Sequence, residues 1–178
     1  LNEDYPNVPL LFNILGACYK AIGEIQGALQ MFEKAVSIKP DYGEVHNNIG
    51  IIFLQLNKLD SAVKSFNRAI ESMPNFYGAF YNLGIAFKKL NRLEDAVNSY
   101  KKVLSIKPEY PEAYNNLGTV LKELGRIEPA IENYIKATLI KPNYAEAHNN
   151  LGVLYKDIGN IDKAIDNLKS GKWELSQC

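Results

Sequence analysis

Hydrophobic residues recur along this chain with the spacing of amphipathic helices, and the pattern returns at a fixed interval. Apolar side chains follow one another at steps of three and four residues over 45–56 and again over 113–124, which predicts a helix in each segment. A second apolar stripe, for example Ala62, Phe66 and Ala69, predicts a partner helix after the first. The pattern therefore predicts a series of helix pairs.

Prolines and glycines mark a constant interval of 34 residues. They are Pro6, Pro40, Pro74, Pro108 and Pro142, and Gly16, Gly50, Gly84, Gly118 and Gly152. With these prolines placed at position 32 of a repeat, residues 1–8 are predicted to be the tail of a preceding repeat. Repeats 1 to 5 then occupy 9–42, 43–76, 77–110, 111–144 and 145–178, the last with a divergent end, and are expected to form one continuous domain.

Glycine recurs at two positions of the repeat, and we expect a different role at each. Position 15 is always glycine or asparagine (Gly23, Asn57, Asn91, Gly125 and Gly159), the residues that accept the left-handed conformation at a helix end. The glycine at position 8 lies inside the first helix, where it costs about 1 kcal/mol relative to alanine. We expect it to permit close approach of the second helix, with the alanine at position 20 facing it.

Composition and charge narrow the class of protein. The 178 residues are 47% hydrophobic and 22% charged, typical of a packed globular protein, and the 20 basic and 20 acidic side chains cancel. Neither nucleic acid nor a membrane is therefore an expected partner, and no apolar run is long enough to span a bilayer. Cys18 and Cys178 form no metal-binding pattern, and Cys18 is expected to be buried. The compartment stays open, with a reducing cytoplasm as the default.

The residues that recur in most repeats resemble those of the tetratricopeptide repeat (TPR). They are Leu or Ile at position 7, Gly at 8, Tyr or Phe at 11, Ala at 20, Phe or Tyr at 24, Ala at 27 and Pro at 32. The resemblance covers essentially the whole chain. It implies an all-α protein, a right-handed α-solenoid of five stacked helix-turn-helix repeats whose first helices line a concave groove that binds peptides or protein segments.

Asparagine recurs on one side of the predicted first helices, opposite their packed side. Each carboxamide offers two donors and an acceptor, which complements the backbone of an extended peptide. Apolar residues at position 9 and charged residues at the margins accompany this row. The candidate peptide-binding residues are Asn48, Asn82, Asn116 and Asn150 at position 6, Asn47, Asn115 and Asn149 at position 5, Ile51 and Ile85 at position 9, and Glu112, Lys88 and Lys122.

The same asparagines have a second interpretation, in which they bond neighbouring backbone or join adjacent repeats and are purely structural. The position-6 row is similar to that of the O-linked N-acetylglucosamine transferase repeats, which implies contact with peptide backbone. Repeats that clamp the carboxylates of chaperone tails carry lysine at position 2. This chain has Leu10, Glu44, Gly78, Glu112 and Glu146 there, so a chaperone tail is not the expected ligand.

No residue pattern indicates catalysis, a cofactor or a metal site. His46 and His148 share position 4 on the packed side and are expected to be core residues, and no nucleophile–base pair or phosphate-binding loop is present. The sequence thus predicts a non-catalytic scaffold for protein–protein interaction that binds extended peptides. The alternative is a substrate-recruiting arm of a larger, glycosyltransferase-like enzyme. Apolar faces at the solenoid ends make self-association a further hypothesis.

Overall fold

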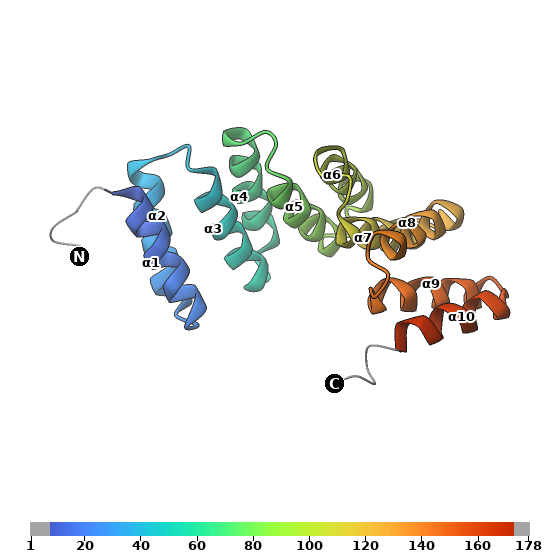
Figure 1. Ribbon diagram of the computed structural model, residues 1–178. Coiled ribbons are helices and arrows are strands. Elements are labelled where there is room, and N and C mark those ends of the chain that lie inside the picture. Colours follow the sequence, from blue (N-terminus) through green and yellow to red (C-terminus); the bar gives the residue numbers. More distant parts are fainter. Residues whose placement is uncertain (1–7, 173–178) are drawn as a thin grey trace. The chain divides into compact units, whose positions relative to one another are not determined.

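A computed structural model describes residues 8–172, which form ten α-helices and no strand (Figure 1). The first helices of the predicted repeats are α1 (Pro9–Ala21), α3 (Gly43–Gln55), α5 (Tyr77–Lys89), α7 (Pro111–Glu123) and α9 (Ala145–Asp157). The second helices are α2 (Ile25–Ile38), α4 (Leu59–Ser72), α6 (Leu93–Ile106), α8 (Ile127–Ile140) and α10 (Ile161–Lys172). The all-α fold class is confirmed.

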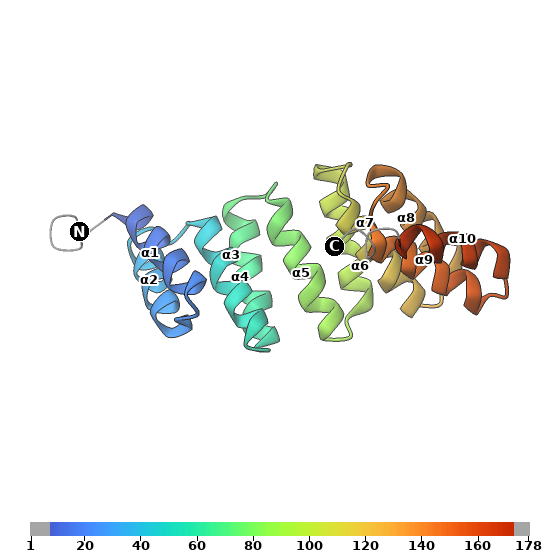
Figure 2. The same cartoon turned by 60° about the horizontal axis from the view of Figure 1, so that its bottom comes forward.

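The helices divide into two compact units, Leu1–Asn91 and Arg92–Cys178. In the N-terminal unit α1 packs against α2, α3 against α4, and α4 against α5 (Figure 1). In the C-terminal unit α7 packs against α8, α8 against α9, and α9 against α10 (Figure 2). The boundaries of the five repeats and their union in one continuous domain stay predictions. The predicted tail at 1–8, apart from Val8, and Cys178 at the divergent end lie outside the described residues.

The turns within the helix pairs use the left-handed conformation predicted at position 15. The φ angle is 83° at Gly23 and 57° at Asn57, and the other three residues at this position also have positive φ. Glycine has no Cβ to clash there, and asparagine tolerates the conformation better than most residues. The next backbone N–H then closes the helix end, as Lys58 does by donating to the carbonyl of Phe53 at 2.8 Å.

The glycines at position 8 lie under close neighbours on the second helix, namely the side chain at position 24 and, in repeats 4 and 5, also the backbone carbonyl of the alanine at position 20. A Cβ on Gly50 would lie 2.5 Å from the ring of Phe66, and one on Gly118 would lie 2.9 Å from the ring of Tyr134. Side chains on a helix lean toward its N-terminus, so the ring at position 24 covers the surface one turn earlier. The prediction of close approach is confirmed. A Cβ on Gly118 would also lie 3.2 Å from the carbonyl oxygen of Ala130, so the alanine at position 20 faces the glycine in that repeat as predicted, and the ring at position 24 is an additional neighbour.

Cys18 is exposed, which contradicts the expectation that it is buried. The residues at the same repeat position, including Ile52 and Val120, have no exposed surface. Ile52 belongs to a cluster with Ala28 and Phe32 of the preceding helix pair, and that neighbour is what buries it. No helix pair precedes α1 among the described residues, so Cys18 has no such cover.

Candidate functional site

Hydrogen bonds join the adjacent asparagines of one first helix to those of the next. The position-6 amide donates from Nδ2 to the Oδ1 atom at position 5 of the preceding repeat. The distances are 3.2 Å from Asn48 to Asn13, 2.9 Å from Asn82 to Asn47, and 2.9 Å from Asn150 to Asn115. The repeated pair is thus a donor and an acceptor that tie α1 to α3, α3 to α5, and α7 to α9.

The position-5 asparagines differ in how far the protein encloses them. Asn115 has no exposed surface, because its Oδ1 accepts from Asn150 and its Nδ2 donates to Oε1 of Glu146 at 2.9 Å. Asn115 therefore holds Asn150 in place and presents nothing that a peptide could touch. Asn47 is 8% exposed, whereas Asn149 on α9 is exposed.

The position-6 asparagines are all half-buried. In Asn48, Asn82 and Asn150 one N–H enters the bond to the preceding helix. A carboxamide has two N–H groups and an oxygen with two lone pairs, so one N–H and the oxygen are left for other partners. The bond also fixes the orientation of each amide, which lowers the entropy lost when a ligand binds.

The remaining candidate residues lie on the same helices as these amides. In the N-terminal unit, Ile51 on α3 and Ile85 and Lys88 on α5 are half-buried. In the C-terminal unit, Glu112 and Lys122 on α7 are half-buried, as is Asn116 between them. Each unit therefore carries its own set of amides with charged or apolar side chains beside them.

Thr119 occupies the position that Ile51 has in the N-terminal unit. Its Oγ1 donates to the backbone carbonyl of Asn115 at 3.0 Å and accepts from the hydroxyl of Tyr134 at 3.2 Å. Burial raises the pKa of the Tyr134 hydroxyl above its ordinary value, and the bond to Thr119 opposes that shift. Both bonds of the Thr119 hydroxyl are therefore made within its own helix pair.

Two partners of the asparagines were not recognised in the sequence. The first is Glu146, whose carboxylate accepts from Asn115 and from the Tyr144 hydroxyl, the latter at 3.4 Å. Tyr42 accepts from Asn13 Nδ2 at 3.4 Å. The sequence carries one signal for the pair of Asn115 and Glu146: an asparagine at position 5 lies 31 residues before a glutamate at position 2 of the next repeat.

His46 is a core residue as expected, whereas His148 is only half-buried. His46 is 6% exposed and its Nε2 lies 2.7 Å from the carbonyl of Pro40, while Nε2 of His148 lies 2.9 Å from the carbonyl of Pro142. A carbonyl only accepts, so Nε2 carries the proton in both rings. Within residues 8–172 no group of three His, Cys, Asp or Glu side chains could hold a metal ion, and no helix is long and apolar enough to cross a membrane.

These helix pairs, with a buried ring over a glycine and a left-handed turn, define an all-α repeat protein. A model described as TPR repeat matches residues 86–125 and 118–159, and one described as tetratricopeptide repeat matches 11–42, together more than half of the chain. The chain belongs to the tetratricopeptide repeat family. A model of the Est1 DNA/RNA binding domain matches residues 28–103.

Solved structures share the fold over nearly the full length of the chain. MamA residues 41–end from Desulfovibrio magneticus RS-1 is 22% identical, with a TM-score of 0.86 over 95% of this chain and 96% of that one. YrrB, described as a TPR protein with an unusual peptide-binding site, is 20% identical, with a TM-score of 0.80 over 96% and 88%. At this identity the likeness shows the fold alone. A search of curated protein sequences found no match.

Proposed function

We propose that this chain is a non-catalytic scaffold for protein–protein interaction and that it binds extended peptide segments along the asparagine side of its first helices. The observation that carries the proposal is that the position-6 amides are half-buried and that those of Asn48, Asn82 and Asn150 are oriented by a bond to the preceding first helix. An extended peptide presents N–H and C=O groups along its length, and amides held in fixed orientation complement both.

The neighbouring side chains support a peptide of mixed character. Ile51 and Ile85 give apolar contact on the N-terminal unit, while Glu112, Lys88 and Lys122 offer charges of both signs. YrrB, which shares the fold, is described as binding peptide at an unusual site. The match to an Est1 DNA/RNA-binding model favours nucleic acid instead. We favour peptide because the chain has no net charge, whereas phosphate binding relies on an excess of lysine and arginine.

The test is peptide-library binding by the wild-type chain and by a variant with Asn82→Ala, Asn116→Ala and Asn150→Ala. The matched control is Asn67→Ala with Asn98→Ala, which removes exposed asparagines from the second helices α4 and α6. We expect peptides to bind wild type and the control and to be lost from the triple variant, with the helical circular dichroism unchanged. Equal binding by all three proteins would contradict the proposal. Tighter binding of single-stranded oligonucleotides than of any peptide would favour the nucleic-acid alternative.

A further inference from the structure

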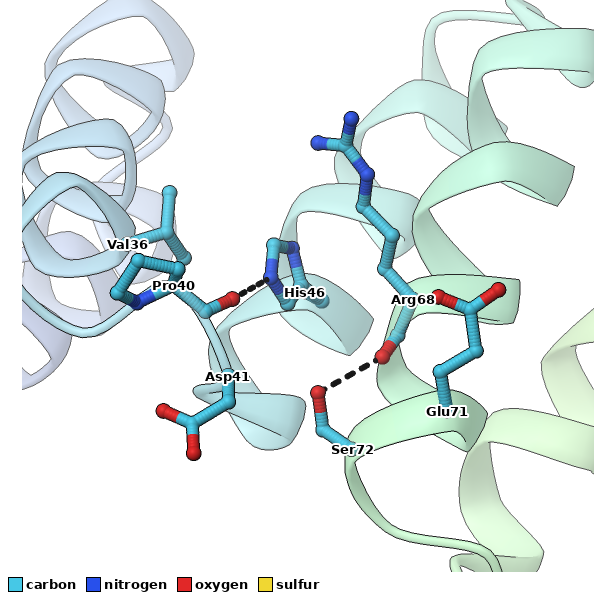
Figure 3. A pocket seen from close by; sticks show the side chains of 7 residues that line it. All are labelled: Val36, Pro40, Asp41, His46, Arg68, Glu71 and Ser72. Carbon is cyan, nitrogen blue, oxygen red and sulfur yellow. Dashed lines mark hydrogen bonds between the residues drawn. The ribbon is translucent and has the colours of Figure 1, made fainter.

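A pocket of about 570 Å³ opens between α2, α3 and α4 in the N-terminal unit, and it uses none of the asparagine-row residues (Figure 3). Val36 and Pro40 form an apolar part of its wall. His46, Arg68, Asp41 and Glu71 supply its polar groups. The pocket is therefore a second surface whose chemistry is independent of the function proposed above.

The pocket exists because repeat 2 departs from its neighbours at two positions. In repeats 1 and 4 a lysine at position 26 lies over an aromatic ring at position 4. The Nζ atom of Lys34 is 5.7 Å from the centre of the Phe12 ring, and that of Lys136 is 5.6 Å from the centre of the Tyr114 ring. Repeat 2 has His46 and Arg68 at these positions. The smaller imidazole leaves space, and the guanidinium of Arg68 has no aromatic partner among the described residues.

His46 offers one unused hydrogen-bond acceptor to this space. Its Nε2 proton is donated to the carbonyl of Pro40, so Nδ1 carries a lone pair. No described residue bonds Nδ1. Every fully buried side-chain nitrogen or oxygen in residues 8–172 has a hydrogen-bond partner, so an atom without one is not fully buried. Nδ1 is therefore open to the pocket that His46 lines. The equivalent atom of His148 instead lies 3.5 Å from Oδ1 of Asn167.

The pocket lining carries charges of both signs, so no single charge on a ligand suits all of its walls. Asp41 and Glu71 repel a carboxylate or phosphate, and Arg68 repels an ammonium or guanidinium group. A neutral aromatic ring suits the apolar wall and restores the cation–ring contact that repeats 1 and 4 make internally. A hydroxyl on that ring donates to Nδ1 of His46. We propose that this pocket receives a tyrosine side chain from a protein partner.

The probe is N-acetyl-tyrosinamide, compared with N-acetyl-phenylalaninamide, which lacks only the hydroxyl. Binding is followed through the NMR signals of the His46 imidazole and the Arg68 side chain. We expect the tyrosine compound to shift both signals and to bind about fivefold more tightly than the phenylalanine compound, the effect of one net hydrogen bond. Equal affinity of the two compounds would overturn the proposal.

Three variants locate the effect. His46→Phe places in repeat 2 the residue that repeat 1 has as Phe12 at the same position, so the fold is expected to survive while the pocket fills and binding disappears. His148→Phe makes the same change at a site without the charged wall and is expected to leave binding unchanged. Arg68→Ser, which introduces the residue found at Ser170 in repeat 5, is expected to weaken both compounds alike. Retained binding by His46→Phe would overturn the proposal.

Discussion

The helix pairs α3–α4 and α7–α8, one from each compact unit, and the helices that follow them carry different chemistry at the same repeat positions. In the first, Phe66 covers the glycine, Ile51 stands at position 9, and Gly78 stands at position 2 of the next repeat. In the second, the residues at these three positions are Tyr134, Thr119 and Glu146. The C-terminal unit thus carries three polar side chains where the N-terminal unit has a phenylalanine, an isoleucine and a glycine.

Each of these three polar residues has a hydrogen-bond partner in the C-terminal unit. The hydroxyl of Tyr134 donates to Thr119, and Glu146 accepts from the fully buried Asn115. A buried polar group without a hydrogen bond is costly, and Thr119 supplies the acceptor that the hydroxyl of Tyr134 needs. In the N-terminal unit Phe66 needs no such partner. The comparison teaches that between these two helix pairs the residues at positions 9 and 24 change together, from an apolar pair to a hydrogen-bonded one.

The largest effect is expected at a feature that the two helix pairs share, the glycine at position 8 that packs against the aromatic ring at position 24. Gly50→Ala places a Cβ 2.5 Å from the fully buried Phe66 ring, which has no room to move. We expect the free energy of unfolding, measured by urea denaturation, to fall by about 3 kcal/mol. Gly118→Ala is expected to be costly too, since its Cβ would meet both the Tyr134 ring and the carbonyl of Ala130.

Gly27→Ala is the control for this prediction, because it makes the same change inside a helix against a mobile neighbour. Its Cβ would lie 3.0 Å from the ring of Tyr19, which is 39% exposed and can turn aside. The better helix propensity of alanine then dominates, and stability is expected to rise by about 0.5 kcal/mol. If Gly50→Ala proves as harmless as Gly27→Ala, the close packing of ring on glycine is not a constraint.

The second prediction concerns the bond between Glu146 and Asn115, since Glu44 at the same repeat position in the N-terminal unit makes no such bond to a described asparagine. Glu146→Ala removes the acceptor of Asn115 Nδ2, and the buried amide loses that bond. We expect a loss of about 2 kcal/mol in the free energy of unfolding. Glu146→Gln keeps an oxygen acceptor and should recover most of that loss.

Glu44→Ala is the matched control, since Glu44 has the same repeat position on an exposed site and no bond to an asparagine among the described residues. Its stability is expected to stay within about 0.5 kcal/mol of wild type. Equal losses from Glu44→Ala and Glu146→Ala would show that the bond to Asn115 contributes nothing, and the two units would then not differ in the way described above.

Much of the fold could be predicted because its signals are local. The left-handed turn at Asn57 follows from a residue type that tolerates positive φ at the end of an apolar stripe. The helix pairs follow from the spacing of residues such as Ala62, Phe66 and Ala69. TPR membership followed from the same residues recurring in register, and the family models agree.

The pairing of the asparagines could not be predicted, because it depends on how neighbouring helices are oriented. Asn82 and Asn47 are 35 residues apart, and a helical wheel gives the side on which each lies but not which amide reaches the other. The same limit explains Cys18, whose exposure depends on what precedes its helix and not on its own repeat position. Periodicity identified the polar side of the first helices and left the bonds within it undetermined.

The smallest expected effect tests whether Thr119 and Tyr134 act as one set. Thr119→Val alone leaves the buried Tyr134 hydroxyl without its acceptor and is expected to cost about 2 kcal/mol, whereas Tyr134→Phe alone should cost about 1 kcal/mol. The double variant gives the pair the apolar character of Ile51 and Phe66. Replacing both partners of a hydrogen bond by apolar groups of the same shape is nearly neutral, so the double variant is expected to lie within about 0.5 kcal/mol of wild type.

The coupling energy comes from urea denaturation of all four proteins in a double-mutant cycle. Additive losses would mean that the two residues contribute independently, and that the polar chemistry of the C-terminal unit is not a bonded set.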